Sequence, residues 1–147
     1  MTYTMQPVGL IHSPFTEKAD TPIQPSRSQA RGWVEVFPEY ELGLEGLEGF
    51  SYIILLYVFH CSDGYSLKVT PFLDHQQHGL FATRHPCRPN PLGLSIVRLL
   101  KREGNRLEIE GVDVLDQTPL LDIKPYVPDF DQHPDARTGW YELRSKE

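Results

Sequence analysis

The amino-acid sequence predicts an all-β fold, a small antiparallel β-barrel of about six or seven strands with long loops. Two observations support this prediction. First, 13 prolines and 11 glycines divide the 147 residues into short segments. Second, apolar residues within these segments alternate or form short runs and do not recur with helical period. A chain of this length is about one ordinary domain, so we expect residues 1–147 to form a single barrel domain.

The first part of the chain predicts two strands joined by a long loop. Pro7 to His12 is the first strand, and Thr16 to Ser28, which is rich in Pro, Ser and charge, is the loop. From Gly32 to Phe37, Val34 and Val36 alternate with larger or charged side chains, as a half-buried strand requires.

The next two segments differ sharply in character. Glu39 to Gly49 carries three glycines spaced three apart with leucines between them, which predicts a helical turn or a tight loop. Ser51 to His60 is apolar almost throughout, so as a strand it needs cover on both faces. Because the outer face of a small barrel normally meets water, this strand predicts a homodimer.

Three further strands complete the predicted barrel. They are Tyr65 to Thr70, Gly93 to Lys101 and Leu107 to Leu115. In the last of these the apolar positions change from odd to even numbers across Gly111. We therefore expect a glycine β-bulge at Gly111, because an extra residue restores the side-chain register.

Composition and charge exclude some classes of protein. A hydrophobic content of 39% with 23% charged residues is typical of a globular chain. The net charge of −6 argues against a protein that coats nucleic acid by charge alone. Basic residues do gather between Arg84 and Arg106, where they form either a local basic face or solvated charges at strand edges.

The sequence also indicates where the protein acts. Its longest apolar run, Tyr52 to Phe59, is far shorter than the roughly 18 residues that cross a bilayer. The N-terminus lacks the features of a signal peptide, so we expect a cytoplasmic protein without a membrane partner. Cys61 and Cys87 form no CxxC pair and are expected to be unbridged thiols.

One segment presents arginines on a stiff loop. Gly79 to Ser95 reads GLFATRHPCRPNPLGLS, with three prolines within six residues, and prolines fix φ and remove backbone donors. The loop carries Arg84 and Arg88, whose guanidinium groups pair bidentately with a phosphate or a carboxylate. The alternative is a proline-braced turn with surface arginines.

A second segment combines a turn with a polar strand. Residues 116–128 read DQTPLLDIKPYVP. Asp122 and Lys124 fall on the same side of a short strand and predict a pair at the barrel rim. Asp116 and Thr118 lie in a turn, where their oxygens either bind the amine or hydroxyls of a ligand or cap the strand as an Asx-turn.

These two segments resemble the paired signature of the tRNA methyltransferase O (TsaA-like) family, whose usual forms read FATRSPxRPNPIGLS and DGTPVLDIKPY. Residues 8–15, 47–51 and 59–60 resemble further elements of that family, so the resemblance spans nearly the whole chain. It implies a homodimeric small β-barrel that uses S-adenosyl-L-methionine. The implied activity is N6-methylation of threonylcarbamoyladenosine beside the anticodon of tRNA.

The resemblance also implies the site residues. The cofactor-binding positions it carries over are Pro22, Ile23, Gln24, His60, Cys61, Arg84, Leu94, Asp116, Gln117, Thr118 and Pro119. The catalytic candidates are His60, Arg88, Asp122, Lys124 and Tyr126. Three positions depart from the family pattern, namely Ile23, His85 and Gln117. Gln117 replaces the glycine of DGTP, so a positive φ there costs about 1 kcal/mol that glycine avoids.

Other functions are also compatible with parts of the sequence. The main alternative is an S-adenosyl-L-methionine-binding protein that acts on another acceptor or serves as a non-catalytic sensor. The acidic net charge and the short chain favour that alternative, whereas the DIKPY segment favours an enzyme. His75 and His78 lack a third ligand at a recognisable spacing, so we expect a solvated loop there and no metal site. Ser95 lies in no GxSxG motif, which excludes that hydrolase class.

Overall fold

The structure, a computed structural model, describes residues 1–18, 21, 28–72 and 74–144. Most of the predicted loop at residues 16–28 lies outside the described residues. The described chain forms two compact units. The barrel unit comprises Met1–His60 and Leu92–Tyr126, and the second unit comprises Cys61–Pro91 and Val127–Glu147. The single domain expected for the whole chain stays a prediction.

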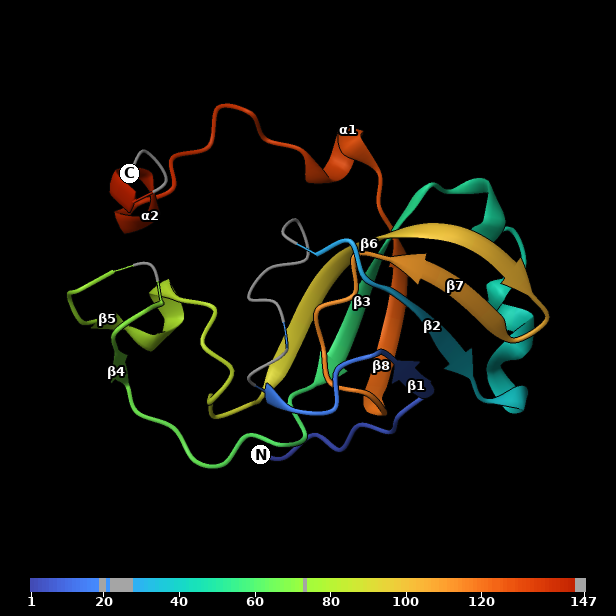
Figure 1. Cartoon of the computed structure of the whole chain (residues 1–147), viewed down its shortest axis with the longest axis horizontal. Helices are drawn as coiled ribbons and strands as arrows, with labels where there is room; N and C mark the ends of the chain where they lie inside the picture. The colour runs from blue at the N-terminus through green and yellow to red at the C-terminus, as the bar shows by residue number, and fades with distance from the viewer. Residues whose placement is uncertain (19–20, 22–27, 73, 145–147) are drawn as a thin grey trace. The chain divides into compact units, whose positions relative to one another are not determined.

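Six antiparallel strands close into a barrel, which confirms the predicted fold class (Figure 1). In their order around the barrel the strands are β1 (Gly9–His12), β2 (Arg31–Val36), β7 (Arg106–Glu110), β6 (Leu92–Glu103), β3 (Tyr52–Val58) and β8 (Thr118–Pro125).

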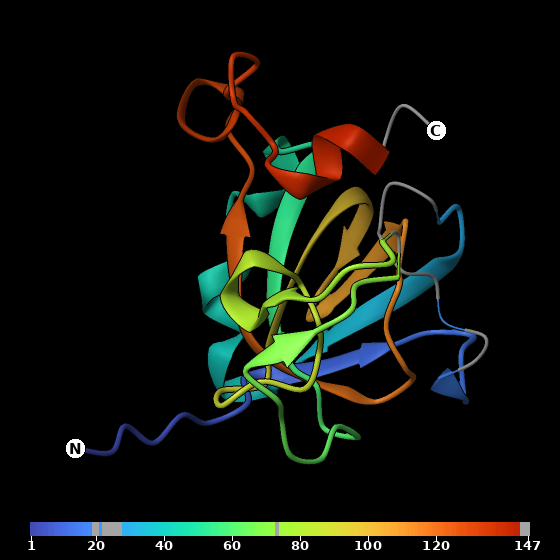
Figure 2. The ribbon, with the colours of Figure 1, turned by 90° about the vertical axis from the view of Figure 1, so that its left-hand side faces the viewer.

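Alternation along the strands fills the barrel interior. Val34 and Val36 of β2 are buried as predicted, and β1 contributes the buried Ile11. The strands β1 and β2 pair side by side (Figure 2). Leu55 of β3 and Val97 of β6 are buried in the same core. Because every second side chain of a strand faces the same side of the sheet, the sequence pattern determines which residues form this core.

The strand β7 is shorter than predicted, and the glycine bulge expected at Gly111 is present just beyond its end. β7 ends at Glu110, and Gly111 has φ of 96°. The amide nitrogens of Gly111 and Val112 both donate to the carbonyl of Ala30. Two residues thus oppose the single residue Ala30, as in a β-bulge with a left-handed glycine, and Val112 and Val114 are buried as the restored register requires. A further register shift lies between Leu99 and Lys101, where β6 pairs with β7.

The outer face of β3 and β6 is largely apolar. On β3, Ile54 and Leu56 are half-buried. Opposite them on β6, Ile96 and Leu94 are 39% and 47% exposed. An apolar patch of this kind on an outer barrel face is typical of a surface that another molecule covers.

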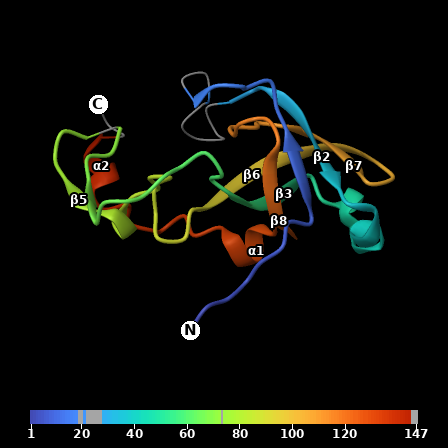
Figure 3. The ribbon, with the colours of Figure 1, turned by 90° about the horizontal axis from the view of Figure 1, so that it is seen from below.

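The segment after β2 forms 3₁₀ turns, as its glycine spacing indicated. η3 (Pro38–Leu44) and η4 (Leu47–Gly49) lie at the barrel end that also holds the β6–β7 turn (Figure 3). There the Arg102 guanidinium contacts the Glu48 carboxylate at 3.3 Å.

The second unit contains a two-stranded sheet, β4 (Lys68–Val69) with β5 (His78–Gly79), followed by η5 (Leu80–Ala82). The strand predicted for residues 65–70 is thus mostly wrong, because only two of its residues find a partner. The short helices α1 (Pro128–Asp131) and α2 (Trp140–Arg144) follow in the same unit. Among the described residues, no helix has the length and apolarity that crossing a membrane requires.

Candidate functional site

Residues 116–119 form a tight turn at the start of β8. Gln117 has φ of 65° and is the one non-glycine residue in the described chain with a positive φ. The Thr118 hydroxyl is buried and donates to the Leu115 carbonyl at 2.6 Å. The positive φ that the sequence analysis considered for Gln117 is therefore present, and the Thr118 hydroxyl closes the turn.

Asp116 anchors this turn to the end of β1. Its backbone nitrogen donates to the Phe15 carbonyl at 2.7 Å, and its Oδ1 accepts from the Ser13 backbone nitrogen at 3.0 Å. The same Oδ1 lies 3.5 Å from Nδ1 of His12. One oxygen of Asp116 thus holds the turn against the end of β1, a long-range contact that differs from the local Asx-turn considered from the sequence.

An incompletely paired edge of β6 lies in the same barrel unit. The Leu99 nitrogen donates to Ser51 next to β3, so the odd residues of β6 hydrogen-bond toward β3 and the even residues face β7. Pairing with β7 begins only at Arg98. Within the described residues no strand pairs with the β7-facing side of Leu94 and Ile96. We call these two positions the β6 edge.

The polar pair predicted on β8 is present. The Lys124 Nζ lies 3.0 Å from the Asp122 Oδ2, which confirms that the two side chains share one side of the strand. Asp122 pairs with Leu56 of β3, and Leu56 pairs with Leu94 of β6. Asp122 and Leu94 are therefore two strand spacings apart in one row, about 10 Å.

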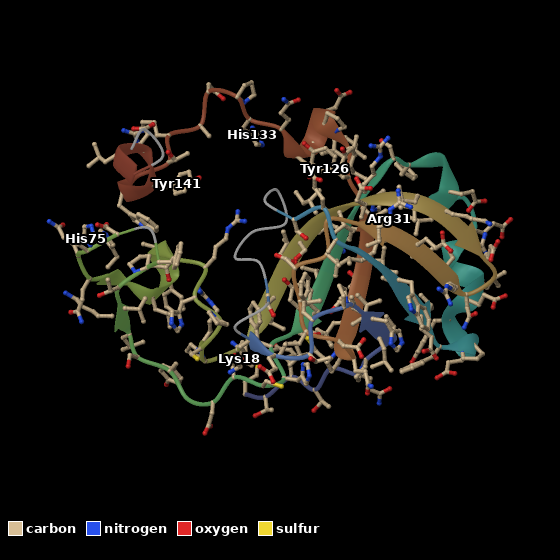
Figure 4. The ribbon with its side chains drawn as sticks, viewed as in Figure 1. Lys18, Arg31, His75, Tyr126, His133 and Tyr141 are labelled. Atoms are coloured by element: carbon tan, nitrogen blue, oxygen red, sulfur yellow. The ribbon has the colours of Figure 1, made fainter. Side chains whose placement is uncertain are left out.

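Tyr126, another catalytic candidate, follows β8 directly (Figure 4). Its ring packs edge-on against Tyr52 at 6.4 Å, and its nitrogen donates to the Tyr52 carbonyl.

The predicted arginines belong to the second unit. Arg84 is exposed, whereas the Nη1 of Arg88 donates to the carbonyls of Thr83 and His85 at 2.9 and 3.0 Å. Arg88 therefore braces its own loop and is half-buried, which differs from the surface arginine of the alternative. Cys61 is exposed in the same unit.

The structure places the remaining predicted residues as follows. His60 is exposed just after β3, and Pro119 pairs with Leu10 of β1. The predicted cofactor residues Pro22, Ile23 and Gln24 lie outside the described residues.

Beside the turn lies a half-buried acidic group, Asp113, that was not predicted from the sequence. The Asp113 Oδ1 accepts a hydrogen bond of 2.7 Å from the Ser95 hydroxyl, which in turn lies 2.7 Å from the Tyr57 hydroxyl. Burial raises the pKa of Asp113 to about 6, and the hydrogen bond from Ser95 offsets part of this rise. An acidic residue between two buried valines, Val112 and Val114, was the signal that could have identified it.

The two neighbouring histidines of the second unit have different surroundings. His75 is exposed, as predicted for a solvated loop (Figure 4). His78 is half-buried, pairs with the Asp74 carboxylate and stacks on Trp140, so a solvated loop is wrong for this residue. Within the part of the chain that the structure describes, no three His, Cys, Asp or Glu side chains are grouped so that they could hold a metal ion.

The closed six-stranded barrel, the 116–119 turn bonded to β1 and the unpaired β6 edge together define a small all-β domain with a candidate binding site. Residues 10–132 match the family described as the tRNA-methyltransferase O N-terminal domain, and the chain belongs to this family. The crystal structure of TrmO from Pseudomonas aeruginosa superposes with a TM-score of 0.81 at 45% identity. That match covers 95% of this chain and 62% of the Pseudomonas protein.

Two curated relatives show the range of named activities. A probable S-adenosyl-L-methionine-binding protein of Pyrococcus abyssi is 55% identical over 93% of this chain and 75% of its own length. A tRNA (adenine(37)-N6)-methyltransferase of Rattus norvegicus is 40% identical over 95% of this chain but only 35% of its own length. The chain thus spans about a third of the rat enzyme, and most of the Pyrococcus protein.

Proposed function

We propose that this protein binds S-adenosyl-L-methionine on its barrel and transfers the methyl group to N6 of threonylcarbamoyladenosine in tRNA. The observation that carries the proposal is the β6 edge at Leu94, which lies in one unit with the 116–119 turn. Family membership and relatives named for S-adenosyl-L-methionine binding or tRNA methylation support it.

The chemistry of the β6 edge fits an adenosyl group. Backbone N–H and C=O groups at an unpaired strand edge offer a donor beside an acceptor, which is what the hydrogen-bonding edge of adenine requires. The exposed side chains of Leu94 and Ile96 supply an apolar surface next to these groups. In the proposal these positions hold the nucleoside, and the 116–119 turn contributes the exposed Gln117 and its backbone.

The remaining roles follow from position and charge. When bound, the cofactor supplies a methyl group on a cationic sulfur that an in-line nucleophile displaces. Asp122 accepts the proton that the acceptor nitrogen loses, and Lys124, 3.0 Å away, orients its carboxylate. The exposed Arg84 pairs with the threonyl carboxylate or a tRNA phosphate. His60 and Tyr126 remain further catalytic candidates. Arg88 stabilises the conformation of the loop that carries Arg84.

We further propose that the protein is a homodimer. The outer face of β3 and β6 presents Tyr52, Leu92, Leu94 and Ile96, each at least 39% exposed. A stable interface removes such a patch from water. A second copy of the same chain is the partner that the sequence pattern of residues 51–60 predicts.

The proposed reaction is tested by incubating the protein with methyl-labelled S-adenosyl-L-methionine and total tRNA from cells that lack the enzyme. We expect label in tRNA, and we expect Asp122→Asn to abolish labelling without weakening cofactor binding measured by calorimetry. Cofactor binding without any labelling of tRNA would favour the non-catalytic alternative, which the naming of the Pyrococcus relative also favours. No binding at all would contradict the proposal as a whole.

A further inference from the structure

A chain of hydrogen bonds joins three elements inside the barrel unit. The Tyr57 hydroxyl of β3 lies 2.7 Å from the Ser95 hydroxyl of β6, and the Ser95 hydroxyl donates to the Asp113 carboxylate at 2.7 Å. Ser95 is 1% exposed and Tyr57 is buried. Asp113 lies in the loop at residues 111–117 that connects β7 to β8.

The barrel makes room for this polar chain among apolar neighbours. Ser95 occupies an inward position of β6 where the next inward residues are Val97 and Leu99. A Cβ atom at Gly93 would lie 2.2 Å from the Tyr57 ring. Polar groups in a core cost free energy unless their hydrogen bonds are complete, so an apolar residue at position 95 would be the simpler choice for stability alone.

The polar chain connects the two parts of the proposed cofactor site. Ser95 is the neighbour of Leu94 at the β6 edge, and Asp113 precedes Asp116 by three residues. β3 lies between β6 and β8 in the barrel, so the edge and the turn are not adjacent in the sheet. The loop at residues 111–117 leads from β7, the other neighbour of β6, to the turn, and the hydrogen bond from Ser95 to Asp113 ties this loop to β6.

The opposite side of the loop is fastened to β1. The Ser13 hydroxyl donates to the Val114 carbonyl at 2.6 Å, and the Ser13 nitrogen donates to the Asp116 carboxylate. With the loop fixed to β1 by Ser13 and to β6 by Asp113, the turn has one position relative to the β6 edge. Ligand sites depend on such fixed geometry, because an ordered site loses less entropy when it binds.

We propose that Asp113 is a positioning residue, which holds the 116–119 turn at the correct distance from the β6 edge through its hydrogen bond with Ser95. This inference rests on the proposed function, because it concerns affinity for S-adenosyl-L-methionine. It adds a role for Asp113, Ser95 and Tyr57 that requires no contact between these residues and the cofactor.

The test measures S-adenosyl-L-methionine affinity by calorimetry for the whole chain and for Asp113→Ala, Ser95→Ala and Asp113→Asn. Loss of one positioning hydrogen bond raises Kd by about five- to tenfold in each alanine variant. The double alanine variant is no weaker than either single variant, because both remove the same link. Asp113→Asn keeps near-wild-type affinity, since its amide still hydrogen-bonds the Ser95 hydroxyl.

The matched control is Val36→Ala. Val36 is 2% exposed and pairs with Gly9 of β1, whereas His12 at the other end of β1 adjoins the turn. We expect this control to lower the melting temperature as the alanine variants do but to leave Kd unchanged.

Each other outcome has a definite meaning. Unchanged affinity in Ser95→Ala would overturn the inference even if Asp113→Ala fails to fold, provided that Ser95→Ala is folded and the wild type binds. Equal losses in Asp113→Asn and Asp113→Ala would overturn it too, because they indicate a charge acting on the ligand directly. A wild-type protein that does not bind the cofactor would instead refute the proposed function.

Discussion

Gln117 carries a side chain where the backbone favours glycine. Its φ of 65° places it in the left-handed region, which costs a residue with a Cβ atom about 1 kcal/mol. Replacing Gln117 by glycine should therefore raise the free energy of unfolding by about 0.5–1 kcal/mol, measured by urea denaturation. Gln117→Ala is the control and should give no such gain, because alanine keeps the Cβ atom. Equal stabilisation in both variants would show that the glutamine side chain, and not the backbone, is responsible.

Asp113 should make stability depend on pH. Burial raises its pKa to about 6, above the value near 3.9 in an unfolded chain, so the folded protein binds the proton more tightly. Stability due to this group is present below about pH 4 and is lost as pH rises through 6, by up to about 3 kcal/mol. Urea denaturation between pH 4 and 7 should show a smaller decline for Asp113→Asn. The same decline in both proteins would contradict this assignment.

At the scale of single elements, β6 depends on a missing side chain. A Cβ atom at Gly93 would lie 2.2 Å from the Tyr57 ring and 2.8 Å from the Phe59 ring. Overpacking of this kind typically costs 1–3 kcal/mol, so Gly93→Ala should lower the free energy of unfolding by about that amount. Gly43→Ala, whose Cβ meets no atom within 4 Å, is the control and should be close to neutral. A neutral Gly93→Ala would show that the two rings move aside freely.

The sequence predicted those elements that bury one face. Alternation at Val34 and Val36 predicted β2 within a residue at each end, because register in a half-buried strand is fixed by its apolar side chains. The strand predicted at residues 65–70 failed because strand formation there depends on a partner that the local pattern does not specify. The bulge at Gly111 was predictable because the apolar positions change from odd to even numbers across it, whereas the end of β7 at Glu110 depends on where its partner strands end.

Candidate site residues were predictable where local pattern determines their place. The pairing of Asp122 with Lys124 follows from strand period alone. The hydrogen bond between the side chains of Asp113 and Ser95 joins positions 18 residues apart. The local sequence pattern does not predict such a long-range bond. The bracing of its own loop by Arg88 was neither of the two alternatives drawn from the sequence, because an arginine fork suits a carbonyl as well as a phosphate and the local pattern does not distinguish them.

At the scale of the whole molecule, the apolar outer face of β3 and β6 predicts self-association. Ile96 on this face should tolerate no charge, so Ile96→Lys should convert a dimer into a monomer in sedimentation equilibrium. Leu42→Lys, at an exposed leucine in η3, is the control and should leave the assembly unchanged. A wild-type protein that sediments as a monomer at micromolar concentration would contradict the proposed homodimer.

The most direct test of the account is the change in backbone amide signals when S-adenosyl-L-methionine is added to the isotope-labelled protein. If the cofactor occupies the β6 edge and the 116–119 turn, the amides of Leu94, Ile96 and Gln117 should shift most. Gly104 in the β6–β7 turn, which lies beyond the paired part of β6, should not shift. An unchanged spectrum, or shifts that leave Leu94 and Ile96 unaffected, would contradict the account.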